Sequence, residues 1–236
     1  MAAEPRFAIY FVPAADSALY RFGAAVLGYD CYSGTPLARL GGAGLSEAEW
    51  TALTAEPRTY GFHATLKAPF RLRDEFDQDA LLAQLQTLAQ AITMIPSFEP
   101  AVGLIGGFVA ILPRTASPGL GQLAADCVRG FERFRLPMTQ QERSKRLAAG
   151  LSPRQTANLE RWGYPYVFEE FRFHMTLAGR IEPDRRAAIH ALLQAEFLRL
   201  HGRGPVRIDQ LALMRQEQAD APFRVIGHGR LRDRTG

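Results

Sequence analysis

The chain has 236 residues, of which 47% are hydrophobic and 22% are charged, and this composition is typical of a globular protein rather than a disordered or coiled-coil one. The 28 basic and 24 acidic residues give a formal net charge of +4, which favours an anionic ligand, and no block of like charges marks a nucleic-acid-binding arm. The two cysteines, Cys31 and Cys127, lie in no metal-ligand spacing, and the longest apolar stretch falls short of a membrane span. We therefore expect a cytoplasmic protein with no membrane partner.

Hydrophobic periodicity predicts strands and helices mixed along the chain. The first strand is expected at 7–12, followed by a helix at 16–27 that Gly28 can end. Ser46 and Glu49 have the spacing of a capping box, which begins a short second helix. The other expected elements are a strand at 60–67 closed by Pro69, a helix at 79–93, a hairpin of strands 102–105 and 108–112, a helix at 119–135, a strand at 171–177, a helix that includes 189–200, and strands at 206–214 and 223–231. This mixture predicts an α/β or α+β sheet protein.

Residues 139–166 differ from their surroundings, because they are polar, rich in Arg and Gln and end in an aromatic cluster at 162–166. A helix is expected to begin at Ser152, which can act as its N-cap, and to end at Gly163. We interpret this segment as a helical insertion in a single domain that spans 1–236. Its place before a candidate motif predicts a flap over one edge of a cleft.

A short motif occurs twice, as Phe62-His63-Ala64-Thr65-Leu66 and as Phe173-His174-Met175-Thr176-Leu177, with four of five positions identical. The chain has five histidines, so chance does not readily explain the match. The spacing of 111 positions is too long for a solenoid repeat and suggests two related lobes.

Strand geometry gives these motifs a chemical interpretation. Side chains alternate between the faces of a strand, so each motif would present its histidine and threonine on one face and its apolar residues on the other. The same alternation would add Lys67 and Arg172 to the polar faces. Imidazoles can act as base and acid near neutral pH, and hydroxyls and cations can stabilise negative charge on a phosphate. Neither motif has a cysteine or carboxylate beside its histidine, so we expect no metal and no other cofactor.

These paired motifs resemble those of the two-histidine (2H) phosphoesterases, which carry two His-x-Thr/Ser-hydrophobic sequences. The strings 8–13, 60–67, 162–167 and 171–174 are similar to the bacterial branch found beside carbon–phosphorus lyase genes of phosphonate metabolism. The resemblance implies a bilobal fold of mostly antiparallel sheet, with helices outside and a central cleft. It also implies that His63, His174, Thr65 and Thr176 are catalytic. We expect substrate binding by Lys67, Arg172, Tyr10, Tyr164 and Tyr166.

The function that this resemblance implies is that of a metal-independent cyclic phosphodiesterase, a hydrolase that opens a small cyclic phosphate ester. A ribose cyclic phosphate of phosphonate breakdown is one candidate substrate. RNA with a 2′,3′-cyclic phosphate or a 2′,5′ linkage is a second and less favoured partner, for which 143–146 and the aromatic residues near 164 offer a weak basic track. A protein that binds a phosphate ligand without catalysis is the third hypothesis.

Overall fold

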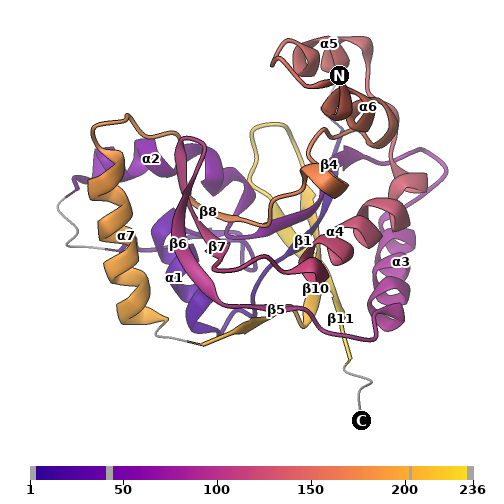
Figure 1. Ribbon diagram of the computed structural model, residues 1–236. Coiled ribbons are helices and arrows are strands. Elements are labelled where there is room, and N and C mark those ends of the chain that lie inside the picture. Colours follow the sequence, from indigo (N-terminus) through magenta and orange to yellow (C-terminus); the bar gives the residue numbers. More distant parts are fainter. Residues whose placement is uncertain (1–3, 41–44, 202–203, 233–236) are drawn as a thin grey trace.

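A seven-stranded antiparallel sheet forms the centre of the molecule in the computed structural model, which describes residues 4–40, 45–201 and 204–232 (Figure 1). The strand order is β11-β10-β1-β4-β8-β7-β6, and two small sheets pair β2 with β3 and β5 with β9. The strands are β1 (Arg6–Phe11), β2 (Tyr29–Asp30), β3 (Thr35–Pro36), β4 (Ala64–Arg71), β5 (Ser97–Phe98), β6 (Pro100–Ile105), β7 (Phe108–Pro113), β8 (Met175–Ala178), β9 (Val206–Arg207), β10 (Gln210–Gln216) and β11 (Arg224–Arg230). This arrangement confirms the expected α+β class.

Helices pack against both halves of the sheet (Figure 1). The helices are α1 (Ala18–Leu27), α2 (Glu47–Tyr60), α3 (Gln78–Ala91), α4 (Pro118–Gly130), α5 (Gln140–Leu147), α6 (Pro153–Trp162) and α7 (Arg186–Leu200), with 3₁₀ turns η1 (Glu132–Phe134) and η2 (Phe168–Glu170). α3 contacts β10 and β11, and α4 contacts β4, whereas α7 contacts β6 and β7. Both α1 and α2 contact β8. Within the described part of the chain, no helix is long and apolar enough to cross a membrane.

Several helix ends lie where the sequence predicts them. Ser46 and Glu49 form a complete capping box at the start of α2, and Ser152 does the same with Gln155 at the start of α6. Gly28 and Gly163 end α1 and α6 in the left-handed conformation, with φ of 66° and 74°. That conformation favours glycine because a side chain would clash with the backbone.

The two strands that carry the motifs begin later than predicted. The strand expected at 60–67 is β4, which starts at Ala64 and continues through Pro69, because α2 extends to Tyr60. The strand expected at 171–177 is β8, which starts at Met175. In both cases the histidine just before the strand bonds the backbone carbonyl two residues earlier through its imidazole.

β4 and β8 meet in the middle of the sheet through the pair Ala64–Met175. These are the central residues of the two His-x-Thr motifs. Continuing the antiparallel register from this pair sets His63 opposite Thr176 and Thr65 opposite His174. The sheet register therefore brings all four polar motif side chains together at the junction of its two halves.

Each motif leucine is an extra residue in its strand. The pairing of β1 with β4 passes from Ile9–Lys67 to Tyr10–Thr65 and skips Leu66. The pairing of β7 with β8 passes from Val109–Ala178 to Ala110–Thr176 and skips Leu177. A β-bulge of this kind interrupts the alternation of side chains and re-aims those that follow.

Gly23, in the middle of α1, packs directly against the first motif. A Cβ there would lie 2.2 Å from the ring of Phe62, the residue before His63. We expect Gly23→Ala to lower the free energy of unfolding by about 1–3 kcal/mol, because a well-packed core has no room for the methyl group. Urea denaturation measures this change.

Gly121→Ala in α4 is the matched control, because a Cβ there has nothing within 4 Å. Alanine in a helix with free space should be neutral or stabilise by about 0.5–1 kcal/mol. Equal destabilisation by both substitutions would contradict the packing described for Phe62.

Candidate active site

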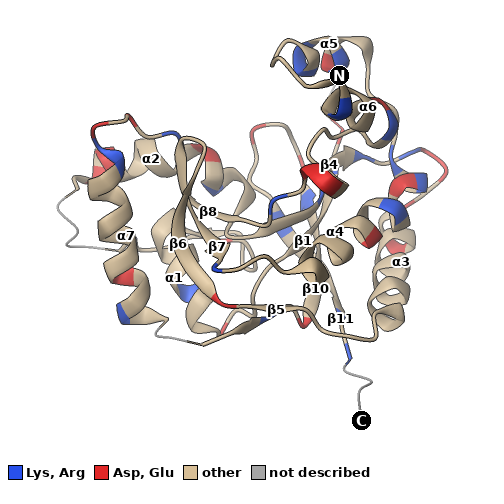
Figure 2. Cartoon of the chain, in the orientation of Figure 1, with Lys and Arg blue, Asp and Glu red and all other residues tan. Residues whose placement is uncertain are grey.

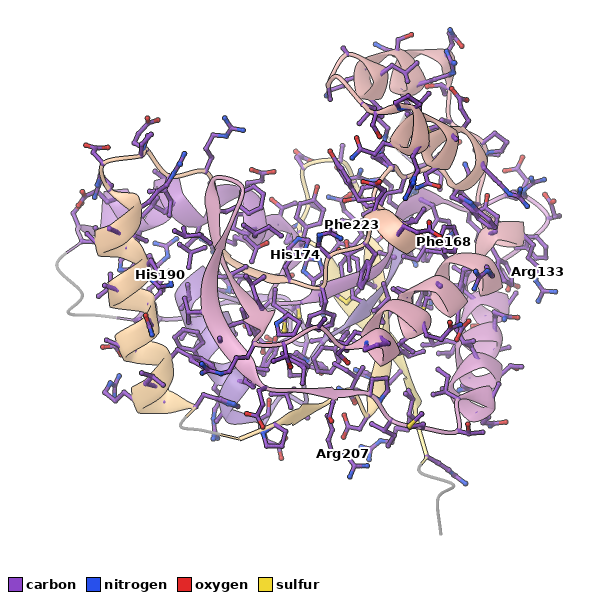
Figure 3. All side chains as sticks on the ribbon, viewed as in Figure 1. Arg133, Phe168, His174, His190, Arg207 and Phe223 are labelled. Carbon is purple, nitrogen blue, oxygen red and sulfur yellow. The ribbon has the colours of Figure 1, made fainter. Side chains whose placement is uncertain are left out.

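One cavity of about 350 Å³ is lined by both motifs, through His63, Thr65, His174 and Thr176. Tyr10 from β1 and Tyr164, which follows α6, also line it. Figure 3 labels His174 near the middle of the view and His190 on α7, and both side chains are half-buried. The structure thus brings together six of the nine residues that the sequence singled out for catalysis and binding.

The ring of His63 is held by three neighbours. Its Nδ1 lies 2.9 Å from the carbonyl oxygen of Gly61, and its Nε2 lies 3.1 Å from Oγ1 of Thr65. The ring stacks on Tyr10 with centroids 3.8 Å apart. Because a carbonyl only accepts, Nδ1 carries the proton, and in the neutral ring Nε2 accepts a hydrogen bond from the Thr65 hydroxyl. Nε2 is therefore the basic nitrogen of this imidazole.

Burial lowers the pKa of His63 from its ordinary value of 6.5 to about 4, and the nearby His174 lowers the pKa further. The bond to Gly61 acts in the opposite direction and does not outweigh burial. His63 is therefore neutral at pH 7 and able to accept a proton. Burial also raises the pKa of Tyr10 well above its ordinary value, so that its hydroxyl stays protonated beneath the ring.

His174 repeats the arrangement of His63. Its Nδ1 lies 2.7 Å from the carbonyl oxygen of Arg172, two residues before it, as Gly61 stands two residues before His63. Nδ1–H therefore donates to this carbonyl, and Nε2 is the nitrogen that a ligand can reach. The two histidines share one local geometry at two places in the chain.

Lys67 is not at the cavity, although the alternation of side chains predicted it there. The bulge at Leu66 turns its side chain away from the face of Thr65, and only 3% of Lys67 is exposed. Its Nζ bonds Glu132 at 2.8 Å and the carbonyl oxygen of Val128 at 3.2 Å. Lys67 is part of a buried ion pair, so its assignment to substrate binding is corrected.

Arg172 and Tyr166 line a second cavity of about 330 Å³ rather than the first. This second cavity is mainly apolar, and it shares Thr65, His174 and Tyr164 with the first one. Arg172 is exposed, and its guanidinium donates to the carbonyl oxygens of Glu169 and Phe171. The two cavities are thus neighbours on either side of His174.

Two arginines that the sequence analysis did not assign to the first cavity line it as well. Arg6 comes from β1 and Arg146 from α5 of the insertion. Arg6 shares a strand face with Tyr10, so alternation along β1 could have identified it. Arg146 had no such signal, because the sequence does not show where an insertion packs.

The histidines and the glutamate that line the cavity are not gathered into a metal-binding cluster in the described part of the chain. Among residues 4–40, 45–201 and 204–232, no group of three or more His, Cys, Asp and Glu side chains could hold a metal ion. The groups that can meet a ligand are two imidazoles, two threonine hydroxyls, tyrosine hydroxyls, two guanidinium groups and the carboxylate of Glu56. This set suits proton transfer at an anionic group.

Residues 65–224 match the family described as "Protein of unknown function (DUF1045)". The chain belongs to this family. It is also 38% identical over 221 residues to a protein of Janthinobacterium sp. (strain Marseille) and 32% identical over 221 residues to one of Laribacter hongkongensis (strain HLHK9). Both relatives are named "Ribose 1,5-bisphosphate phosphokinase PhnN". The matches cover 92% and 93% of this chain but 49% and 50% of the relatives, so the chain spans about half the length of these curated relatives.

These matches correct the function expected from the motifs. A phosphokinase transfers a phosphoryl group, whereas the expected enzyme was a hydrolase that opens a cyclic phosphodiester; the name of both relatives therefore overturns that expectation. The matches do support the resemblance to the phosphonate-associated branch. Membership of the two-histidine superfamily stays a prediction.

The pKa of His63 predicts how the stability of the protein depends on pH. Between pH 6.5 and 4 the unfolded chain binds a proton at this histidine that the folded protein does not, so the stability falls as the pH is lowered through this range. Urea denaturation should show a smaller fall in His63→Gln, which lacks this group. NMR titration should show the His63 ring titrating near pH 4, and a pKa near 6.5 would contradict the burial described here.

Substitution of Lys67 should affect stability rather than binding. Lys67→Ala leaves Glu132 with its bond to Arg135 at 2.6 Å but removes a buried partner, and the loss of one member of a buried ion pair typically costs about 3–5 kcal/mol. We expect a lower Tm and unchanged affinity for a phosphorylated ligand, measured by calorimetry below the new Tm. A loss of affinity with an unchanged Tm would instead show that Lys67 contributes to substrate binding.

Proposed function

We propose that the chain is an enzyme that acts on a phosphate ester of a pentose and transfers the phosphoryl group between oxygen atoms. The paired imidazoles in one cavity carry this proposal. The name of the two relatives supplies the substrate class, because a ribose bisphosphate is a phosphorylated pentose.

The proposed reaction divides the proton transfers between the two histidines. His63 is neutral, so its Nε2 takes the proton from the oxygen that attacks phosphorus. His174 acts as the acid in this proposal and passes a proton from Nε2 to the oxygen that leaves as its bond to phosphorus breaks. One proton is accepted and one is donated, and a return of the proton from His63 to His174 through bulk water restores the starting state.

The remaining lining residues fit a phosphorylated sugar. The hydroxyl of Thr176 can donate to a non-bridging oxygen of the phosphate, where negative charge is concentrated. Thr65, whose single O–H donates to Nε2 of His63 in the free protein, can turn this hydrogen to the phosphate once Nε2 takes the proton of the attacking oxygen. The carboxylate of Glu56, from α2, also lines the cavity and can accept hydrogen bonds from sugar hydroxyls. A small polar ligand with one reacting phosphate would use all of these groups.

The phosphoryl donor is a matter for experiment. The sequence contains no Gly-x-x-x-x-Gly-Lys-Ser/Thr motif, so its own residues provide no P-loop for a nucleotide. Reactions with and without ATP therefore distinguish two phosphoryl donors. Turnover that requires ATP identifies the nucleotide as the donor, and turnover without ATP identifies the sugar phosphate as the donor.

We also propose that the chain is a member of the two-histidine superfamily. Three repeated features support the relationship: the His-x-Thr-Leu sequences, the bonds from each Nδ1 to the carbonyl two residues earlier, and the bulges at Leu66 and Leu177. The superfamily relationship concerns the origin of the site. It does not by itself define the reaction, which depends on the groups in the cavity.

Substitution of either histidine tests the proposed function. Incubation of the purified chain with ribose 1,5-bisphosphate, followed by ³¹P NMR, should show turnover that falls about 10²–10⁴-fold in His63→Ala and in His174→Ala, because each loses one proton transfer. The double variant should be little worse than either single one. Thr65→Ala and Thr176→Ala lose only a hydrogen-bond donor and should be milder, at about 10²–10³-fold or less.

His190→Ala is the matched control. His190 lies on α7, outside the cavity, with Nε2 3.2 Å from the carbonyl oxygen of Val102 (Figure 3). Its turnover should equal that of the wild type. No change in any phosphate resonance, with or without ATP, would contradict the proposed function, and so would full activity in His63→Ala.

A further inference from the structure

The two arginines that line the first cavity have no part in the proton transfers proposed above. Arg6 projects from a central strand, and Arg146 projects from the inserted helix α5. They belong to segments that are 140 positions apart in the chain. Their common place at one cavity needs its own explanation.

Several other basic side chains in this part of the molecule have carboxylate partners. Lys67 pairs with Glu132, Arg71 pairs with Glu4 and Glu142, and Arg143 pairs with Glu160. Within the described part of the chain, no carboxylate forms an ion pair with Arg6 or Arg146. The cavity lining therefore has two guanidinium groups without an ion-pair partner, beside the single carboxylate of Glu56.

Both guanidinium groups are positioned by uncharged neighbours. Nε of Arg6 donates to Oε1 of Gln216 at 2.7 Å, and its guanidinium carbon lies 5.7 Å from the centre of the Phe223 ring. The guanidinium carbon of Arg146 lies 6.0 Å from the centre of the Tyr164 ring. The bond to Gln216 occupies Nε of Arg6 and leaves both terminal nitrogens for a ligand.

We propose that Arg6 and Arg146 bind a second phosphate group of the substrate, distinct from the phosphate that reacts between His63 and His174. The proposal rests on the proposed function for the position of the reacting phosphate. A guanidinium group presents N–H donors in a planar fork that matches phosphate oxygens, and such bonds are strong because both partners are charged. The substrate class is accordingly a pentose with phosphates at two positions.

A second phosphate would also connect the insertion to the sheet. α5 has no buried residue, and basic and acidic residues are interspersed along it (Figure 2). Its attachments include the ion pairs Arg71–Glu142 and Arg143–Glu160, which lie away from the cavity lining. An anion held by Arg146 and Arg6 together would add a further link between α5 and the sheet.

Calorimetry on the whole chain tests this proposal without requiring turnover. Ribose 1,5-bisphosphate and ribose 5-phosphate are the two ligands, and the wild type should bind the bisphosphate at least about tenfold more tightly, since bonds to charged groups contribute on this scale. Arg146→Ala and Arg6→Lys should each reduce this ratio, and Arg6→Ala with Arg146→Ala should bring it close to one. Affinity for the monophosphate should change little in any of them.

Arg143→Ala is the control on the same helix, because Arg143 pairs with Glu160 and does not line the cavity. It should keep the preference of the wild type for the bisphosphate. His63→Ala should also keep the preference for the bisphosphate. A wild type that prefers the bisphosphate but shows no turnover would contradict only the proposed function and not the second phosphate site. Equal affinity of the wild type for both ligands, absence of binding, or a full preference in the doubly substituted arginine variant would overturn the assignment of the second phosphate.

Discussion

The pairing of Ala64 with Met175 is the contact on which the candidate site depends. The two halves of the seven-stranded sheet meet through β4 and β8, and the paired residues are the centres of the two motifs. A shift of this register by one residue would send one histidine and one threonine to the opposite face, because side chains alternate along a strand. The buried side chains on either side, Phe62, Leu66, Phe173 and Leu177, resist such a shift because it would expose them.

Part of the fold and of the site follows from the sequence because local rules decide it. Capping boxes and left-handed glycines fix helix ends within a few residues, and the duplicated His-x-Thr sequence identifies the strands that meet at the site. The alternation of side chains fails at Lys67, because the bulge at Leu66 arises from the pairing of β4 with β1. Pairing between distant strands is not a local property, so a single strand sequence does not reveal its bulges.

The sequence does not predict where the insertion packs, for a related reason. Its helices are predicted well by their caps, but the placement of α5 depends on ion pairs such as Arg71–Glu142 with residues far away in the chain. The sequence therefore presents Arg146 only as part of a basic segment, whereas in the folded chain its guanidinium lies beside the Tyr164 ring. The sequence pattern also does not predict the reaction, because paired histidines indicate proton transfers but do not identify the group that is transferred.

The bonds from Nδ1 of His63 and His174 to backbone carbonyls have a consequence for how such a site can change over time. The tautomer of each imidazole is set by a peptide carbonyl, which every amino acid provides, so the bond itself requires no particular side chain at position 61 or 172. Position 61 needs glycine for a different reason, because its φ is 72° and a Cβ there would lie 2.7 Å from Cys31. In sites where a carboxylate side chain orients the histidine, one substitution can remove that control. Here the backbone carbonyls fix the orientation of both imidazoles. Substitutions of the surrounding side chains can therefore change substrate preference while the proton-accepting nitrogen of each ring stays the same.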